Sequence, residues 1–581
     1  MAKLKPNERL VKMRHTAAHV LAAASRELKP DTKLGVGPTT ENGFFHDVQV
    51  EETWTEQDLA KLEKKMKEIR KRNLPIVQRE VNKDEARKLF KDDPYKLELI
   101  EQIEGDTVGV SDMGEGWFVT LCEGGHVEST SKIGKFKLTH LSGVYWQGKE
   151  SNSQLQRIFG VLFETKQELS EYSALLAEAK KRDHRKIGQE LDLFTFSPLV
   201  GPGLPLFTPR GTLIRRQLED FVQSLQEPCG YERVFIPHIT KKELYETSGH
   251  WEKFKDDLFH VKGASDTGFV MKPMNCPHHT QIYASQPRSY RDLPLRYSEV
   301  TVCYRDEQAG ELQGLSRVRA LTQDDAHVFC TTEQVEAEME TIYNIIIEFY
   351  SAFSFKLRPR LSLWDAKKPE KYLGTVEVWE KAQDALRNIL DKKQADYVEE
   401  EGEAAFYGPK IDFIAQDALG RDWQLATIQL DFNLPARFDL TYTDKQGDKK
   451  RVVMIHRAIL GSVERFMAIL LEHYAGALPL WLSPTQVKVL PISDNQLPYA
   501  NQVTTELRAA NIRVEVDDRA ESIGKKIREA QVLKVPVMLI IGKKEEEEKK
   551  VAVRRREAGD QGLSALAQIK AELVQEIKDR K

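Results

Sequence analysis

The sequence predicts an α+β protein built from several domains. The chain has 581 residues, which exceeds the roughly 250 to 300 residues that one hydrophobic core normally supports. Its hydrophobic pattern also changes along the chain: helices mix with short strands at first, closely spaced strands fill the centre, and strands alternate with helices at the end. Each change of pattern indicates a new domain.

The composition is that of an ordinary globular protein. Hydrophobic residues make up 40%, charged residues 30%, and the net charge is only −4, so the overall charge gives no sign of nucleic-acid binding, although a local basic face can still bind RNA. The five cysteines are scattered, which favours a reducing compartment such as the cytoplasm. Neither a secretory leader nor an apolar run of about 18 residues is expected, so the protein is not predicted to cross a membrane.

Residues 1–150 predict an α+β domain. A helical pattern runs from His15 to Leu28, a strand-like run covers Gly43 to Val48, and a charged helix is expected from Gln57 to Arg72. Residues 151–188 predict a connecting helix. Its pattern is helical from Gln154 to about Arg185, and the charge-rich second half indicates a helix that packs on little.

Two pairs of polar residues in the first domain share one spacing. His15 and His19 are four residues apart, which places both on one face of the first helix, and Cys122 and His126 repeat the spacing in a glycine-rich segment. From the residues alone, three readings stay open: a hydrolytic site, a zinc site, or polar residues with a structural role. The helix lacks the glutamate of the zinc-protease pattern HExxH.

Residues 189–480 predict a large, mostly antiparallel sheet. Strands are expected in ERVFIPHI, around Leu361, in KIDFIAQ and in WQLATIQLDF, with short turns such as Asp417 to Asp422 between them. A helix should follow from Ser462 to Tyr474, with Ser462 as its N-cap. Arg465 would then lie beside the positive end of the helix dipole, where an anion is stabilised.

Residues 484–581 predict an α/β domain, separated from the sheet by a linker that Pro479 and Pro484 mark. Between Ile523 and Arg556 this domain has eleven Lys or Arg and five Glu, which gives a local charge of +6 that suits phosphate binding. The alternative is a solvated face. The basic residues we expect to contact RNA are Arg519, Lys526, Arg528 and Arg554.

Several long phrases resemble a known family. LRYSEVTVCYRDE, GLSRVRALTQDDAH, AFYGPKIDF, WQLATIQLDF and MIHRAILGSVERF follow one another as in the class II aminoacyl-tRNA synthetases. KPMNCP, TQDDAH and IHRAILGS resemble the threonine-specific family within that class. The resemblance covers nearly the whole chain, in a form that lacks the small ubiquitin-like N-terminal domain of many members.

The resemblance implies the following organisation. Residues 1–150 would be an editing-type domain, 189–480 a class II catalytic core with an antiparallel sheet of six to seven strands, and 484–581 an anticodon-binding domain. The enzyme would be a homodimer, joined near Gly230 to Pro237, that uses ATP to activate threonine and transfers it to tRNA(Thr).

The resemblance also implies a zinc site. Cys276, His327 and His456 would hold one Zn²⁺ per subunit, although each alone reads as an ordinary buried residue. Three protein ligands leave zinc an open position that the amino group and hydroxyl of threonine can fill. Valine lacks that hydroxyl, and a site of this kind rejects such an analogue by about 10⁴-fold or more.

The remaining roles in the catalytic domain come from the same resemblance. It implies that Arg305, Arg465, Lys410 and Gln323 act in catalysis, that Asp325, Tyr407, Gln424, Ser462 and Met274 bind threonine, and that Arg305, Glu307, Arg317, Gln429 and Arg465 bind ATP with Mg²⁺. Without the resemblance, the contexts of Arg305 and Arg465 suggest phosphate recognition, but an ordinary surface or ion-paired arginine is the favoured interpretation of each. Leu321 departs from the family, where a phenylalanine stacks on adenine, so we expect weaker ATP binding.

Serine keeps the hydroxyl and lacks one methyl group, which discriminates by only about 10- to 200-fold. In the family a second site removes serine from mischarged tRNA, and the resemblance assigns to it His15, His19, Lys96, Cys122, His126 and Asp47. Thr120, Gly125 and His46 depart from the family pattern there. Two other functions stay open: a non-catalytic RNA-binding paralogue, and a zinc hydrolase confined to the first domain.

Overall fold

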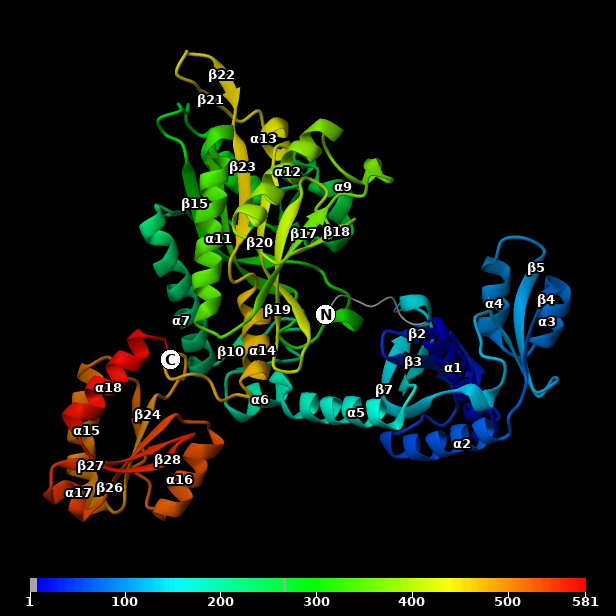
Figure 1. The fold of residues 1–581 in the computed structure, drawn as a ribbon, viewed down its shortest axis with the longest axis horizontal. Coiled ribbons are helices and arrows are strands. Elements are labelled where there is room, and N and C mark those ends of the chain that lie inside the picture. Colours follow the sequence, from blue (N-terminus) through cyan, green and yellow to red (C-terminus); the bar gives the residue numbers. More distant parts are fainter. Residues whose placement is uncertain (1–7, 150, 265–267, 581) are drawn as a thin grey trace. The chain divides into compact units, whose positions relative to one another are not determined.

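The computed structural model describes residues 8–149, 151–264 and 268–580. The chain divides into two compact units, Met1–Ala177 and Glu178–Lys581, whose elements are labelled in Figure 1. The boundary between them falls inside the connecting helix α5, Lys166–Lys181.

In its described residues the first unit folds into two antiparallel sheets (Figure 1). The larger has the order β1-β3-β8-β7, with β2 pairing β3, and shares a core with α1 and α2. The smaller has the order β4-β5-β6 and shares a core with α3 and α4. The bounds are α1 Glu8–Leu28, α2 Leu59–Lys71, α3 Lys83–Leu89 and α4 Pro94–Gln102, with β1 Lys33–Leu34, β2 Thr39–Thr40, β3 Gly43–Gln49, β4 Ile76–Asn82, β5 Thr107–Met113, β6 Phe118–Leu121, β7 Lys135–Tyr145 and β8 Gln154–Phe163.

The high alanine content of α1 explains why this segment is helical and packs closely. Alanine is the best helix former, and Ala17, Ala18 and Ala22 are completely buried, so the helix lies close against the sheet. The predicted helix is confirmed, and it begins seven residues before His15, at Glu8.

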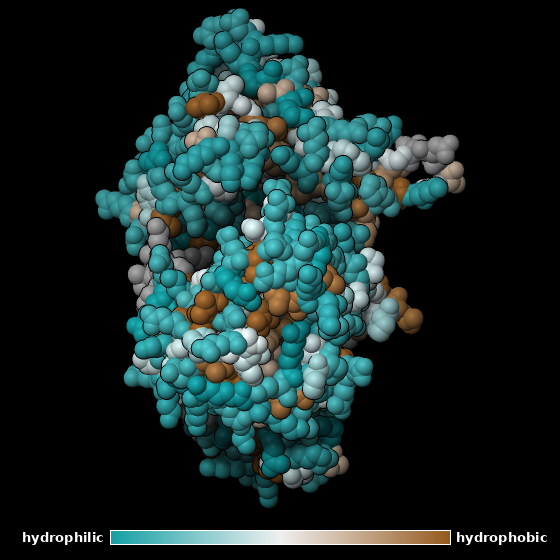
Figure 2. Space-filling model, turned by 90° about the vertical axis from the view of Figure 1, so that its right-hand side faces the viewer, coloured by the Kyte–Doolittle hydropathy of each residue, from teal (hydrophilic) through white to brown (hydrophobic). Residues whose placement is uncertain are grey.

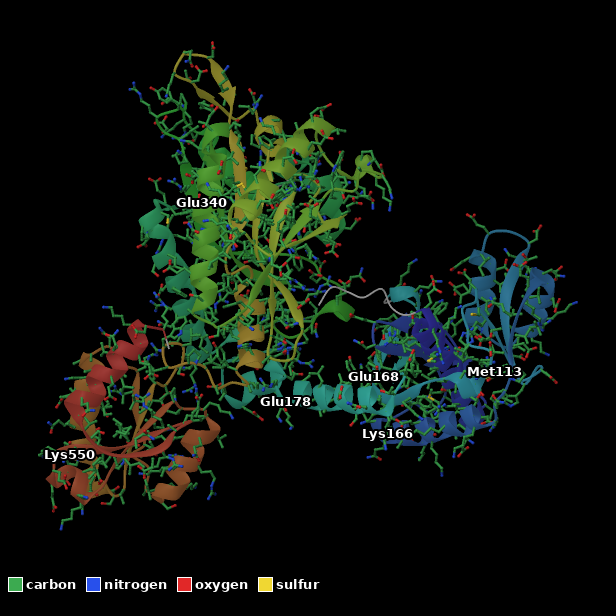
Figure 3. The ribbon with its side chains drawn as sticks, viewed as in Figure 1. Met113, Lys166, Glu168, Glu178, Glu340 and Lys550 are labelled. Carbon is green, nitrogen blue, oxygen red and sulfur yellow. The ribbon has the colours of Figure 1, made fainter. Side chains whose placement is uncertain are left out.

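The prediction of a helix from Gln154 was wrong for its first part. Strand β8 occupies Gln154–Phe163 and pairs with β3 and β7, because a short apolar run does not distinguish a strand from a buried helix. The second part is confirmed as α5, which has no buried residue. Thr165 and Glu168 form a capping box at its start, and Glu178 lies toward its other end (Figure 3).

The second unit contains the expected antiparallel sheet. In the described part of the chain this sheet has eight strands, in the order β11-β15-β16-β23-β20-β19-β17-β18, rather than six or seven, because the short strands β11 and β18 add parallel pairings at its two edges. The bounds are β11 Glu232–Arg233, β15 Leu295–Tyr304, β16 Ala320–Cys330, β17 Leu357–Leu363, β18 Val398–Glu401, β19 Lys410–Gln416, β20 Asp422–Asp431 and β23 Val453–Ala458.

The other elements of the catalytic region surround this sheet. They are α6 His184–Glu190, α7 Pro209–Gln226, α8 Glu243–Ser248, α9 His250–Phe254, α10 Cys276–Ala284, α11 Val335–Ser351, α12 Val376–Lys392, α13 Asn433–Arg437 and α14 Val463–His473, with strands β9 Phe194–Thr195, β10 Leu206–Phe207, β12 Ile239–Lys241, β13 His260–Lys262, β14 Gly268–Met271, β21 Thr441–Thr443 and β22 Lys449–Arg451.

Most of the predicted strands are confirmed, but ERVFIPHI is interrupted: only Glu232–Arg233 form β11, and its last residue, Ile239, begins β12. The N–H of Ile236 bonds to the carboxylate of Glu299, and Pro237 has no N–H to donate to a ladder.

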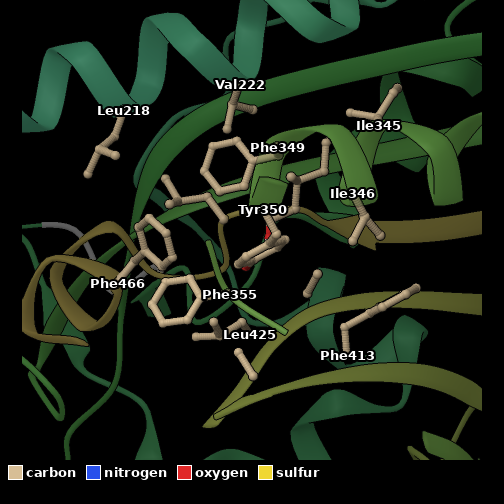
Figure 4. Close-up of a cluster of buried hydrophobic side chains, with 14 of the residues drawn as sticks. Leu218, Val222, Ile345, Ile346, Phe349, Tyr350, Phe355, Phe413, Leu425 and Phe466 are labelled. Atoms are coloured by element: carbon tan, nitrogen blue, oxygen red, sulfur yellow. The ribbon is translucent and has the colours of Figure 1, made fainter. Parts of the chain in front are cut away.

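One face of the large sheet is covered by helices. Phe349 and Tyr350 of α11 pack with Phe466 of α14 over Phe413 and Leu425 of the sheet (Figure 4). A face covered in this way is mainly apolar, and most polar side chains of the same strands lie on the opposite face.

The C-terminal α/β region is confirmed as a mixed sheet. Strands β25, β24 and β26 are parallel, while β27 and β28 continue the sheet antiparallel. The bounds are β24 Val487–Pro491, α15 Leu497–Ala509, β25 Val514–Val516, α16 Ile523–Val532, β26 Val537–Ile541, α17 Lys543–Glu547, β27 Lys550–Arg555, β28 Gly559–Ala565 and α18 Leu566–Lys578. Within the described ranges, none of the helices has the length and apolarity to span a membrane. The face in Figure 2 is mostly hydrophilic, with hydrophobic residues in small areas.

A buried ion pair joins β16 to β23, and its loss should destabilise this unit. Asp324 accepts from the Arg457 guanidinium at 3.0 Å and from the N–H groups of Ile459 and Leu460 at 3.0 and 3.2 Å. Because Asp324→Ala leaves a buried charge unpaired, we expect a loss of about 3 to 5 kcal/mol, measured as a lower urea midpoint. Glu399→Ala, which breaks an exposed pair with Arg387, should cost no more than about 1 kcal/mol. Equal losses would contradict this account.

Candidate functional site

The register of the large sheet lines up polar residues across four neighbouring strands. His327 of β16 pairs with His456 of β23, His456 pairs with Gln429 of β20, and Gln429 pairs with Lys410 of β19. Residues directly opposite each other in antiparallel strands project from the same face. The sequence therefore folds these residues into one row on the face that the core helices leave open.

A bulge adds Gln424 to this face. The register between β19 and β20 shifts at Phe413/Ile414, so that Thr427 pairs with Asp412 but Gln424 pairs with Ile414. Strict alternation would turn Leu425 toward the site, yet Leu425 lies in the core cluster. The bulge re-aims the strand, and the Gln424 amide donates to Asp412 at 2.7 Å.

Asp412 accepts hydrogen bonds from several side chains at the Lys410 end of this row. It was not among the residues predicted from the sequence. Its carboxylate is completely buried and accepts from Arg360 at 3.0 Å, Ser362 at 2.8 Å, Lys410 at 2.7 Å, Gln424 at 2.7 Å and Thr427 at 3.0 Å. Lys410 and Gln424 are thus held in place by one buried anion. Its position two residues after Lys410, on the same side of a strand, was the available signal.

Cys276, His327 and His456 come together as a possible metal site. Their potential ligand atoms all lie within 4.8 Å of one another, and all three residues are buried. Cys276 is the first residue of α10, while the histidines face each other on neighbouring strands. One thiol and two imidazoles form a donor set that suits zinc, so the residues present fit the ion that the sequence implies.

Two further residues orient the histidines. The Nε2 atom of His456 lies 2.8 Å from the Asp431 carboxylate, and Nδ1 of His327 lies 2.8 Å from Nδ1 of His279. Such contacts fix the ring orientation and leave the other ring nitrogen for a metal. Asp431 and His279 were not among the predicted site residues.

Burial sets the protonation of this group. It raises the pKa of the Cys276 thiol well above its usual range, with help from Asp325 and Asp431, and lowers the pKa of His327 well below its usual range. The metal-free protein therefore holds a neutral thiol and a neutral imidazole. Metal binding releases the thiol proton.

The residues predicted to bind threonine lie beside this group. Asp325 accepts from the Asn275 amide at 3.0 Å, and burial raises its pKa. The Tyr407 ring lies 5.1 Å from the His456 ring. Met274 precedes Cys276 by two residues and is half-buried. Gln323 pairs with Thr301 on β15 and bridges to Ser462, which links the amino-acid pocket to the start of α14.

Arg465 is placed to bind an anion. Ser462 caps α14 and accepts from the N–H of Arg465, as predicted. Within the described residues the Arg465 guanidinium has no carboxylate partner, its buried Nε has no hydrogen bond, and it packs 5.6 Å from the Trp423 ring. Burial lowers its pKa, because the charged guanidinium is partly removed from water, and a bound anion would offset that cost.

The other predicted phosphate ligands lie in the loop 305–319 between β15 and β16. Arg305 also forms no ion pair with any described residue. Arg317, by contrast, is paired with Glu307 at 2.6 Å and with Glu311 at 2.8 Å. Leu321 lies at the start of β16, opposite Cys303.

The first unit holds a second polar group. Potential ligand atoms of His15, His19, Cys122 and His126 all lie within 4.8 Å of one another, and the thiol is 3.2 Å from His126 Nε2 and 3.6 Å from His15 Nε2. A pocket of about 550 Å³ opens onto it, lined by Glu8, Val11, Lys12, His15, Pro38, Thr39, Gly124 and Gly125. Burial lowers the pKa of His126 to about 3, so its ring is neutral at physiological pH.

The other two residues predicted for this site are Lys96 and Asp47, and Asp47 does not lie toward the histidine–cysteine cluster. Lys96 is buried, donates to the Gly35 carbonyl at 2.7 Å, and has a pKa lowered to about 8, chiefly by burial. Asp47 is bound by Arg157 at 2.7 and 2.8 Å. His46 lies on the opposite side of β3, the side that shares a core with α1. The structure thus places His46 and not Asp47 toward the cluster.

Family models match three parts of the chain. Residues 259–474 match the tRNA synthetase class II core domain (G, H, P, S and T), residues 486–576 match an anticodon binding domain, and residues 105–159 match the threonyl and alanyl tRNA synthetase second additional domain. The first range includes the row on the large sheet and both unpaired arginines. The third includes Cys122 and His126.

Known relatives extend over the whole chain. Threonine–tRNA ligase of Thermosynechococcus vestitus is 47% identical over 585 residues, covering 99% of this chain and 96% of the relative. The chain belongs to the threonine–tRNA ligase family. The enzyme of Rubrobacter xylanophilus is 48% identical over 556 residues, covering 95% and 86%.

A solved structure agrees with this family assignment. A crystal structure described as the RNA binding domain of threonyl-tRNA synthetase from Cryptosporidium parvum Iowa II has a TM-score of 0.64 and 41% identity, covering 68% of this chain and 98% of that one. As a member of the threonine–tRNA ligase family, the chain has the expected class II core.

In this threonine–tRNA ligase family member, the predicted RNA contacts of the C-terminal region fall into two groups. Lys526 is buried and donates to the carbonyls of Pro491 and Asp517, each at 3.0 Å, and Arg519 is paired with Asp517 and Glu529, each at 2.6 Å. These contacts do not support direct phosphate binding by either residue. Arg528 is exposed and Arg554 half-buried, and both stay predictions.

The contact between Asp431 and His456 predicts a change in metal affinity. Asp431→Asn keeps the shape of the side chain but removes the charge that polarises the His456 ring, so we expect zinc affinity to fall about 10- to 100-fold. Competition with a chromogenic chelator measures this. Asp444→Asn, in the turn between β21 and β22, is the control and should leave affinity unchanged. Equal affinities in the two variants would contradict the role of Asp431 in orienting His456, and a wild-type protein that binds no zinc would contradict a zinc site here.

Proposed function

We propose that this protein is an ATP-dependent threonine–tRNA ligase that selects threonine through a zinc ion. The observation that carries the proposal is the meeting of Cys276, His327 and His456, from distant parts of the sequence, beside Asp325. A zinc ion held there would supply an open coordination position for the amino group and hydroxyl of threonine.

The side chains around the metal position the substrates. Asp325 is proposed to hold the ammonium group, with Tyr407 and Gln424 lining the pocket. Arg305 and Arg465, which have no carboxylate partner in the described part of the structure, are proposed to hold the phosphates of ATP, together with Mg²⁺. Catalysis then rests on orientation and charge neutralisation, without a covalent protein nucleophile.

In the proposed reaction, a carboxylate oxygen of threonine attacks the α-phosphorus of ATP and pyrophosphate leaves. Lys410 lies in the same row as His456 and is proposed to neutralise charge on the reacting carboxylate. A terminal ribose hydroxyl of tRNA(Thr) then attacks the carbonyl carbon of threonyl-adenylate and AMP leaves, with Arg528 and Arg554 as candidate tRNA contacts on the anticodon-binding region. Free cysteines suit the proposed cytoplasmic location.

The segment from Gly230 to Pro237 is the proposed homodimer interface. Phe235 is 82% exposed, and Ile239 just beyond it is 46% exposed. Large apolar side chains that gather at one place on a surface are typical of protein contacts.

The second polar group is proposed to hydrolyse seryl-tRNA(Thr). The imidazole of His15 is neutral at physiological pH, since burial lowers its pKa, and it is the proposed general base for water. The pocket beside His15 has the volume typical of a small-ligand site.

Threonine-dependent exchange between ATP and pyrophosphate tests the synthetic reaction. Threonine should support exchange, serine should be about 10- to 200-fold poorer, and valine about 10⁴-fold poorer or worse. Removal of zinc by a chelator should abolish the preference for threonine over valine. No exchange with any amino acid would favour a non-catalytic paralogue, and equal rates with threonine and valine would contradict selection through a hydroxyl.

Release of serine from seryl-tRNA(Thr) tests the second site. If His15 is a general base, His15→Ala should slow release by about 10² to 10⁴-fold. Lys67→Ala, on the exposed face of α2, is the control, and charging with threonine by both variants shows that they are folded. A wild-type rate equal to spontaneous hydrolysis would contradict the proposed editing.

A further inference from the structure

A buried histidine at the start of α6 contacts two parts of the catalytic region. The His184 ring lies with Nδ1 2.6 Å from the Glu472 carboxylate and accepts the N–H of Leu315 at Nε2, at 3.0 Å. Since Nε2 is an acceptor, Nδ1 must carry the proton and donate it to Glu472. Both ring nitrogens are therefore committed in one tautomer.

These residues do not form a metal site. Asp183, His184 and Glu472 bring possible ligand atoms within 4.8 Å of one another. However, Arg421 pairs with Glu472, and Arg185 pairs with Asp183 at 2.6 Å. The group is thus a hydrogen-bonded network whose negative charges already have partners.

The contact to Leu315 fixes the end of the loop 305–319. Within the described residues, His184 is the acceptor found for the N–H of Leu315, whose side chain is completely buried. Gln313 and Arg317 close a turn around it, from the Gln313 N–H to the Arg317 carbonyl at 3.1 Å. A Cβ at Gly314 would lie 2.3 Å from His184 Nε2, so the loop passes the ring at a distance that only glycine allows.

The other contact fixes the loop relative to α14. Glu472 lies in the last turn of α14 and also pairs with Arg421, while the first turn of the same helix carries Arg465. The loop carries Arg305 and Arg317 at its two ends. One imidazole therefore connects the two elements that hold the candidate phosphate ligands.

We propose that His184 is a positioning residue for ATP: it holds the loop 305–319 at a fixed place relative to α14, so that Arg305 and Arg465 face one phosphate chain together. The inference rests on the proposed ATP-binding role of those arginines. It adds a residue that lies outside the substrate pocket and acts through the main chain at Leu315.

Two substitutions separate the two contacts of the ring. In His184→Asn the amide can replace Nδ1 and still donate to Glu472, but nothing reaches the Leu315 N–H. In His184→Gln the longer side chain places its oxygen near the position of Nε2, where it can accept that N–H. His473→Gln changes a neighbouring histidine whose ring packs 4.6 Å from the Phe355 ring, and it is the control for stability.

The Michaelis constants in threonine-dependent pyrophosphate exchange give the first readout. His184→Asn should raise the KM for ATP about three- to tenfold, the effect of one lost buried hydrogen bond, and leave the KM for threonine unchanged. For His184→Gln the KM for ATP should stay within about twofold of the wild-type value, because its amide oxygen restores the hydrogen bond to the Leu315 N–H. Equal KM values for ATP in the Asn and Gln variants, or a parallel rise in the KM for threonine, would overturn the proposal.

Amide hydrogen exchange of residues 313–317 gives a second readout that needs no activity. Faster exchange in His184→Asn than in His184→Gln and His473→Gln supports the loop contact, and identical exchange in all variants overturns it. A wild-type protein without threonine-dependent exchange would instead refute the proposed function, while the hydrogen-exchange comparison would still test the contact itself.

Discussion

The antiparallel register of β16, β23, β20 and β19 is the constraint on which the catalytic site depends. It brings His327, His456, Gln429 and Lys410 into one row, although they come from strands far apart in the sequence. A slip of one residue in any of these strands would turn its polar residues into the core. The apolar residues that alternate with them lie beneath α11 and α14 and prevent such a slip.

Buried carboxylates hold the polar face of that sheet in place. Asp412 fixes Lys410 and Gln424, Asp431 orients His456, and Asp324 ties β16 to the end of β23. A buried anion is stable only when hydrogen-bond donors surround it, so each of these residues imposes a geometry on its neighbours. Arg465 and Arg305 differ from these paired groups because neither guanidinium has a carboxylate partner in the described residues. Both are therefore available for a bound anion.

The proposed selection of threonine over valine and serine would use different chemistry in the two units. A hydroxyl can be recognised strongly by a site that leaves a polar group unsatisfied in its absence, whereas a single methyl group contributes little. The metal-type cluster in the second unit suits the first task. The neutral imidazoles and the open pocket of the first unit suit hydrolysis of a product that the first site accepts wrongly. Their separate cores allow each to be shaped independently.

Local features could be read from the sequence because they depend on neighbours along the chain. The strands at Lys410–Gln416 and Asp422–Asp431, helix α14 with its Ser462 cap, and the shared face of His15 and His19 all follow from periodicity and capping. The resemblance to a family added the candidate ligands Cys276, His327 and His456, which no spacing would have selected.

Other features needed the folded chain. Two of these features depend on a partner strand: strand β8 in place of a helix, and the bulge that turns Gln424 toward the site. The others are contacts between residues 12 to 131 positions apart: those of Asp412 and Asp431, and the link from His184 to Leu315. Such contacts are set by strand register and by the satisfaction of buried polar groups. Neither is encoded in a local pattern, because each depends on which distant segment packs alongside.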